Sequence, residues 1–73
     1  MKYEVQRALN IEGKIYNIGD YLLVKEKGKD DLYLVKLLNI RWIDEYNACI
    51  ETGDCTYDLR AIDILGKVDN VKN

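Results

Sequence analysis

Apolar and polar side chains alternate with a period of about two residues along much of the chain, which is typical of half-buried β-strands. The alternation is clear over residues 3–9 and returns in the apolar run Tyr21–Glu26, which has the sequence YLLVKE. A polar loop at Lys27–Asp31 precedes a long strand that we expect from Leu32 to about Ile43. Because the period is mostly two rather than the 3.6 of an amphipathic helix, the sequence predicts an all-β protein.

The apolar positions of the two central strands also predict how these strands pair. The expected cross-strand pairs are Val24 with Val35 and Leu22 with Leu37. This register places Lys25 and Lys36 on the opposite face of the sheet. The parity of the apolar positions changes near Leu38–Asn39, and a bulge or sharp bend there would let both halves of the strand face one core. Bends of this kind allow a small sheet to curl into a barrel.

The segments ACIET and CTYDL flank Gly53–Asp54, which predicts a β-hairpin with a two-residue turn and glycine first. In this register Thr52 faces Cys55 and Ile50 faces Tyr57, on a mainly apolar face. The more polar side chains of the hairpin then lie on the other face.

Residues 60–63, which follow the hairpin, are too few for a stable helix and too polar for a strand. We therefore expect a single 3-10 turn near 60–63, followed by a short strand at Ile64–Leu65. The tail is expected to fray from about residue 67. The chain has no linker or repeat, so residues 1–73 are expected to form one small domain.

The predicted elements follow one another as strand, extended turn, strand, long bent strand, tight hairpin, 3-10 turn and terminal strand. This succession resembles the small SH3-like barrels, and Gly19–Asp20 before YLLV is similar to the "GD-x-V-x-V" opening of their KOW and Tudor variants. The resemblance covers nearly the whole chain and implies a small barrel of five to six short antiparallel strands. It implies no particular function, because such barrels share a pattern rather than a motif.

The charge of the chain is unevenly distributed, although the formal net charge is only -2. Segment 44–63 contains six acidic residues against Arg60 alone. If these acids share a face, they favour a basic partner and repel nucleic acid. The candidate steering residues are Asp44, Glu45, Glu51, Asp54 and Asp58.

No apolar run approaches the ~18 residues of a membrane span, and the first ten residues have no signal-peptide pattern. We therefore expect a cytoplasmic protein with no membrane partner. The chain is rich in Lys, Ile, Asn and Tyr and lacks His and Pro, which indicates an AT-rich bacterial or phage genome.

The residue types exclude most catalytic and metal chemistry. Without His and Ser, a nucleophilic Cys, Thr or Tyr has no obvious base. Cys49 and Cys55 would need carboxylates to complete a zinc site, which is an uncommon ligand set. The hairpin register directs the two sulfurs to opposite faces, with Cys49 the more exposed and Cys55 partly buried. We expect a protein that is not an enzyme and that has no metal and no cofactor.

The remaining feature is apolar surface. If Leu22, Val24, Val35 and Leu37 point inward, several large apolar side chains lie on the outer face of the same sheet. The candidate partner-binding residues are Tyr21, Leu23, Leu34, Leu38, Trp42 and Tyr46. Either another segment of the chain covers this patch, or the patch binds another protein or a second copy of the chain.

These patterns lead to two functional hypotheses. The first is a non-enzymatic protein-interaction module, such as a bacterial or phage accessory protein, that docks through the apolar-aromatic face. The alternative is a small nucleic-acid-binding barrel that uses the basic N-terminal half of the chain. The lysines of this alternative are Lys14, Lys25, Lys27, Lys29 and Lys36.

Overall fold

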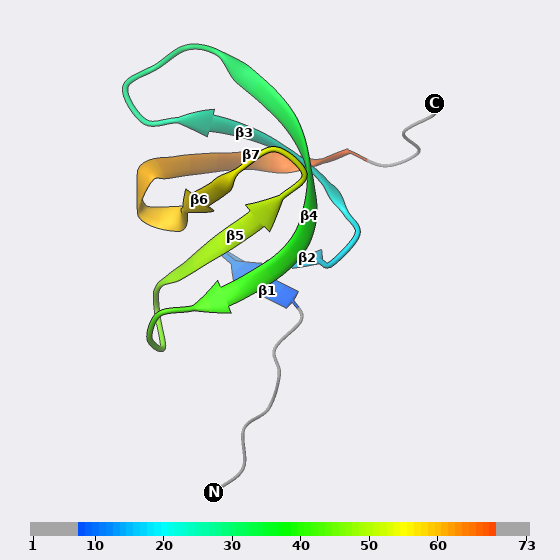
Figure 1. The fold of residues 1–73 in the computed structure, drawn as a ribbon, viewed down its shortest axis with the longest axis vertical. Coiled ribbons are helices and arrows are strands. Elements are labelled where there is room, and N and C mark those ends of the chain that lie inside the picture. The colour runs from blue at the N-terminus through cyan, green and yellow to red at the C-terminus, as the bar shows by residue number, and fades with distance from the viewer. Residues whose placement is uncertain (1–7, 69–73) are drawn as a thin grey trace, which may run out of the picture.

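β-Strands dominate the part of the chain that the computed structural model describes, residues 8–68 (Figure 1). The elements are β1 (Ala8–Ile11), β2 (Lys14–Asn17), β3 (Tyr21–Glu26), β4 (Leu32–Trp42), β5 (Ala48–Thr52), β6 (Thr56–Asp58), the 3-10 helix η1 (Leu59–Ala61) and β7 (Ile62–Val68). The all-β prediction is confirmed. Within the described range, no helix has the length and apolar character that crossing a bilayer requires.

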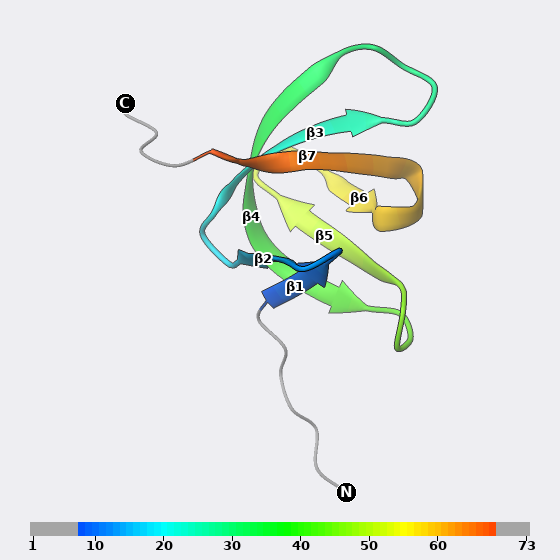
Figure 2. The same cartoon turned by 180° about the vertical axis from the view of Figure 1, so that it is seen from behind.

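Five of the strands form one antiparallel sheet in the order β6-β5-β4-β3-β7, and β1 and β2 form a separate two-stranded sheet. The larger sheet curls around the long, bent β4 (Figures 1 and 2). Its two edge strands, β6 and β7, do not pair with each other within residues 8–68, so the predicted closed barrel is not found. Closure would require a ladder between these edges. β6 is only three residues long, and the chain leaves it directly into η1.

The β1–β2 hairpin has a turn at Glu12–Gly13, whereas the Gly13–Lys14 pair of the sequence predicts a turn one residue later. Both turn residues have positive φ, 52° for Glu12 and 83° for Gly13, which matches the two-residue turn that suits the twist of paired strands. Leu9 pairs with Tyr16, and both side chains are buried in the main core. The strand expected over residues 3–9 is described only from Ala8 onward, because residues 3–7 lie outside the described range.

The register between β3 and β4 differs from the prediction by two residues. Leu22 pairs with Val35, and Val24 pairs with Tyr33. Backbone hydrogen bonds from Leu37 N to Asp20 O and from Gly19 N to Leu37 O continue the ladder beyond β3. A shift of two residues keeps every side chain on its predicted face, because the side-chain period of a strand is two.

The expected irregularity in β4 is confirmed, since the β4–β5 register shifts between Leu37 and Asn39 and leaves Leu38 as the extra residue. The β5–β6 pairing is also confirmed, with Ile50 opposite Tyr57 and a backbone bond of 3.0 Å from Thr52 N to Cys55 O. The turn itself differs in type. Gly53 is not among the residues with positive φ, which a Gly-first hairpin turn would require.

The chain after β6 differs in detail from the expected turn and short strand. η1 covers Leu59–Ala61, whereas Ile62 and Asp63 already belong to β7. β7 is longer than Ile64–Leu65 and extends to Val68, which pairs with Tyr21. Residues 69–73 of the expected frayed tail lie outside the described range.

The core lies on the concave side of the curled sheet, where the β1–β2 hairpin packs against it. Alternate side chains of β3, β4 and β5 point into this core, and Ile62 of β7 joins them. The buried apolar residues are Leu9, Tyr16, Leu22, Val24, Val35, Leu37, Ile40, Ala48, Ile50 and Ile62.

Candidate functional site

The convex, outer side of β7, β3 and β4 carries an apolar surface. It results from the alternation of side chains between the two faces of each strand. Leu22 and Val24 point into the core, so Leu23 points outward. Leu23 lies opposite Leu34 of β4 and opposite Gly66 of β7. Because cross-strand partners point to the same side of a sheet, their side chains form one continuous surface.

We call this surface the docking face. Its members are Tyr21, Leu23, Lys25, Leu32, Leu34, Lys36, Leu38, Asp63 and Val68. Leu32, Leu34 and Leu38 are each about half exposed, at 52%, 49% and 48%. Within residues 8–68, no segment of the chain covers them.

Lysines lie among the apolar residues of the docking face. Lys36 pairs with Tyr21, and its Nζ atom lies 5.8 Å from the centre of the Tyr21 ring. This distance allows a cation–π contact. Lys25 pairs with Leu32 at the other end of the β3–β4 ladder. Lys25 also pairs with Asp63 of β7, so the docking face is apolar in its centre, basic at the Lys36 margin and of mixed charge at the Lys25 margin.

Four of the six predicted partner-binding residues meet on this face, namely Tyr21, Leu23, Leu34 and Leu38. The prediction was wrong for Trp42, which pairs with the fully buried Ala48 and packs against the core. Its Nε1 atom is buried without a hydrogen-bond partner among residues 8–68. Tyr46 is 86% exposed, but it lies in the β4–β5 loop, at the far end of β4 from the docking face.

Sequence reasoning missed Leu32 and Val68 as members of the face. The predicted strand contained Leu32, but the two-residue register error placed it away from Lys25. Val68 was missed because only Ile64–Leu65 was expected to form the last strand. The alternation of Ile62 and Ile64 with Asp63 and Leu65 could have indicated the longer β7.

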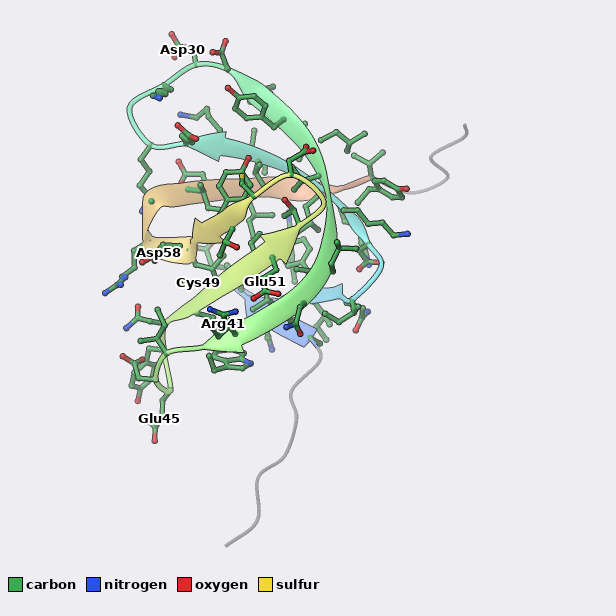
Figure 3. The ribbon with its side chains drawn as sticks, viewed as in Figure 1. Asp30, Arg41, Glu45, Cys49, Glu51 and Asp58 are labelled. Atoms are coloured by element: carbon green, nitrogen blue, oxygen red, sulfur yellow. The ribbon has the colours of Figure 1, made fainter. Side chains whose placement is uncertain are left out.

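The other half of the same outer surface, on β5 and β6, is polar. Its central residues are Arg41, Cys49, Glu51, Thr56 and Asp58 (Figure 3). The Arg41 guanidinium pairs with Glu51, which also accepts a hydrogen bond of 3.3 Å from Asn39 Nδ2. This half has the usual polar exterior of an antiparallel sheet, and the docking face does not.

The predicted steering acids do not form one surface, and three of them are held by local contacts. Glu51 is paired with Arg41. Asp58 is paired with Arg60 at 2.8 Å, and the Arg60 side-chain hydrogen bond, together with the Arg60 backbone N–H, lowers the pKa of Asp58 to about 2. In the β4–β5 loop, hydrogen bonds from the Asn47 side chain and the Tyr46 backbone lower the pKa of Asp44.

Glu45 lies in the β4–β5 loop, whereas Asp54 lies at the tip of the β5–β6 hairpin. The five acids are therefore spread over two loops and the polar half of the sheet. None of them belongs to the docking face.

The lysines of the nucleic-acid hypothesis also lie apart. Lys14 is on β2, in the smaller sheet. Lys27 and Lys29 lie in the β3–β4 loop, where Lys29 Nζ pairs with Glu26 at 3.1 Å. The hydrogen bond and charge of Glu26 raise the pKa of Lys29. Lys25 and Lys36 lie on the docking face, and the Lys25 ammonium also donates a hydrogen bond of 3.2 Å to Lys29 O of the β3–β4 loop.

Both cysteines are free, and their exposure is the reverse of the prediction. Cys49 is half-buried because it lies in β5 between Arg41 of β4 and Asp58 of β6. Cys55 is exposed because it ends the hairpin turn, before β6 begins. Within the described part of the chain, no group of three or more Cys, Asp or Glu side chains is arranged to hold a metal ion.

Comparisons of the chain with protein-family models, with curated proteins and with solved structures find no match.

Proposed function

We propose that the protein is a non-enzymatic interaction module that docks a partner protein on the docking face. The observation that supports this proposal most directly is the contrast between the two halves of one outer surface. The β5–β6 half is polar, whereas the β7–β3–β4 half presents Leu32, Leu34 and Leu38 to solvent. A contiguous exposed apolar patch on a small protein is typical of a protein-binding surface.

We also propose that the curled sheet is a partly open form of the SH3-like barrel. Support comes from the order of its elements. A long bent strand, β4, is followed by the tight β5–β6 hairpin, the 3-10 helix η1 and the terminal strand β7. This is the succession that the resemblance implies.

The proposed docking mode differs from the one expected from composition. The five proposed steering acids lie away from the docking face, so they do not steer a partner to it, and the sixth acid of segment 44–63, Asp63, lies opposite Lys25 at one margin. Lys25 and Lys36 lie on the face itself, which suits a partner with an apolar centre and acidic groups near its edge. Leu23 and Leu34 would supply the buried anchors of the interface.

The test is a pair of matched surface variants, Leu34→Lys on the docking face and Thr56→Lys on the polar half. Both residues are exposed strand positions, so each variant adds the same charge at a similar position. We expect Leu34→Lys to weaken the partner complex by more than about tenfold, because a lysine would be desolvated at the centre of the interface. Thr56→Lys should leave the affinity within about twofold of the wild type.

The measurement is affinity capture from a lysate of the source cells, followed by titration of the captured protein. Light scattering on the isolated chain detects self-association as a separate outcome. A partner that binds Leu34→Lys as tightly as the wild type would contradict the proposal.

The nucleic-acid hypothesis has less support, because its lysines are dispersed and Lys29 is paired with Glu26. A titration with mixed-sequence single- and double-stranded DNA and RNA at about 50 mM salt tests it, since phosphate contacts strengthen steeply at low salt. Binding that is lost in Lys25→Ala and Lys36→Ala would favour this hypothesis over protein docking.

A further inference from the structure

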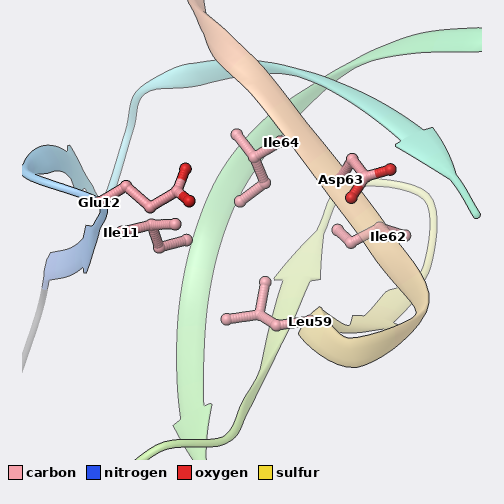
Figure 4. A pocket seen from close by; sticks show the side chains of 6 residues that line it. All are labelled: Ile11, Glu12, Leu59, Ile62, Asp63 and Ile64. Atoms are coloured by element: carbon pink, nitrogen blue, oxygen red, sulfur yellow. The ribbon is translucent and has the colours of Figure 1, made fainter.

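A second candidate binding surface, a small cleft, lies on the opposite side of the sheet from the docking face. A cleft of about 250 Å³ lies between the β1–β2 turn and β7 (Figure 4). Ile11 forms one wall, Ile62 and Ile64 form the other, and Leu59 of η1 closes one end.

The walls of the cleft are apolar, but one carboxylate lies at its mouth. Glu12 stands there on the turn side. Asp63 of β7 also borders the cleft, but it pairs with Lys25 of β3, so its side chain points to the docking-face side of the sheet. Glu12 is exposed and forms no ion pair with another residue of the described range 8–68. An apolar channel with an acidic group at its mouth is complementary to a long aliphatic side chain that ends in a positive charge.

The size of the cleft argues for one side chain rather than a small-molecule ligand. Pockets for drug-sized ligands usually measure about 300–1,000 Å³, and this cleft is smaller. A lysine or arginine side chain can place its methylene groups on Ile11 and Ile64 and its charged group near Glu12.

The neighbouring strand favours an extended peptide as the carrier of that side chain. Within the described residues, β7 pairs only with β3, so its second edge has no strand partner. Unpaired backbone groups on a sheet edge can bind an extended segment through main-chain hydrogen bonds. Ile62 and Ile64 of β7 line the cleft, so a segment bound along this edge would lie beside it.

We propose that this cleft receives a single lysine or arginine side chain of a partner protein, presented by an extended segment along the free edge of β7. The site is separate from the docking face and does not depend on it. The protein would then contact its partners at two places, through an apolar patch on the convex side and through one basic side chain at the open seam of the sheet.

The test is an NMR titration of the full chain, labelled with ¹⁵N, with four capped pentapeptides of sequence Thr-Val-X-Val-Thr. X is lysine, arginine, norleucine or glutamate, and norleucine has the aliphatic chain without the charge. We expect the lysine and arginine peptides to shift the backbone amides of Glu12 and Ile62–Ile64 in a saturable way. Their affinity should exceed that of the norleucine peptide by about threefold, as for an exposed ion pair, and the glutamate peptide should bind least.

Two variants locate the charge contact. Glu12→Gln keeps the shape of the turn residue and should reduce the affinity for the lysine peptide to that for the norleucine peptide. Glu45→Gln, an exposed acid in the β4–β5 loop, makes the same charge change away from the cleft and should have no effect.

Four outcomes would overturn the proposal. They are equal affinity for all four peptides, shifts confined to the docking face, no shifts at about 10 mM peptide, and shifts of the cleft amides that depend on protein concentration without peptide. The last outcome would assign the cleft to a second copy of the chain. Loss of binding in Leu34→Lys with normal peptide titrations would leave the cleft proposal intact, which separates the two tests.

Discussion

The Asp58 carboxylate links the end of β6 to η1 and to the chain that leads into β7. It ends β6, and its Oδ1 atom accepts hydrogen bonds from Arg60 N at 2.8 Å and from Arg60 Nε at 3.1 Å. Its Oδ2 atom accepts a third bond from Arg60 Nη2 at 2.8 Å. These contacts form the N-terminal cap of η1 and turn the chain from β6 toward β7. The contacts of this one side chain therefore define the end of β6.

These contacts predict a pH dependence of stability. The pKa of Asp58 is about 2 in the folded protein and about 4 in an unfolded chain, so the folded state holds the carboxylate in its charged form. Its stabilising contribution is present above pH about 4 and is lost as the pH falls through 2. We expect the free energy of unfolding to fall less steeply between pH about 4 and 2 in Asp58→Asn than in the wild type.

Urea unfolding at a series of pH values, followed by Trp42 fluorescence, measures this slope. Asp54→Asn is the matched control, because it removes the same charge at the tip of the β5–β6 hairpin. Equal slopes in Asp58→Asn and the wild type would show that the Arg60 contacts do not stabilise the folded state.

Among the elements, the β1–β2 hairpin depends most on packing. It shares no strand pairing with the five-stranded sheet among the described residues. A two-stranded hairpin is only marginally stable by itself in water. Leu9 and Tyr16, which point into the core, therefore hold the hairpin in place. The cleft proposed as a receptor also depends on this contact, because Ile11 and Glu12 belong to the same hairpin.

Two substitutions on this hairpin distinguish the contribution of core packing to the free energy of unfolding from that of strand propensity. Leu9→Ala removes a side chain that is 1% exposed and should lower the free energy of unfolding by about 2–4 kcal/mol. Ile15→Ala, at a position that is 54% exposed, should lower it by about 0.5 kcal/mol or less. Urea titrations give both values. Similar losses for the two variants would mean that the hairpin is not anchored through Leu9.

At the scale of the whole molecule, the stability of the sheet is expected to decrease from its centre to its edges. β3, β4 and β5 each have a strand partner on both sides, whereas β6 lies at an edge and has only three residues. Local opening of an edge strand costs less free energy than global unfolding.

Amide hydrogen exchange tests this gradient. The slowest amides of β3, β4 and β5 should exchange only through global unfolding. Amides of β6 and of the β1–β2 hairpin should exchange at least about tenfold faster. Uniform protection across all strands would indicate that the curled sheet opens only as one unit.

The alternation of apolar and polar residues predicted the face on which each side chain lies better than it predicted which residues pair across neighbouring strands. Leu23, Leu34 and Leu38 lie on the outer face as expected, although the β3–β4 register was wrong by two residues. Trp42 points with Ile40 toward the core, as the predicted parity change near Leu38–Asn39 implies, so its inclusion among the outer-face residues conflicted with the predicted bulge. The cleft between Glu12 and Ile64 could not be predicted, because these residues are distant in the sequence and lie together only through packing.

The sequence by itself determined the all-β character, the inward and outward faces of β3 and β4, the bulge in β4 and the β5–β6 pairing. Each of these depends on local alternation or on a short turn, so nearby residues are sufficient to define it. The tertiary structure alone decided that β6 and β7 leave an open seam, that Asp63 lies opposite Lys25 on the docking face, and that the other acids of segment 44–63 lie away from that face. These features depend on which distant strands meet and on how far each ladder extends, and no local pattern of side chains specifies either.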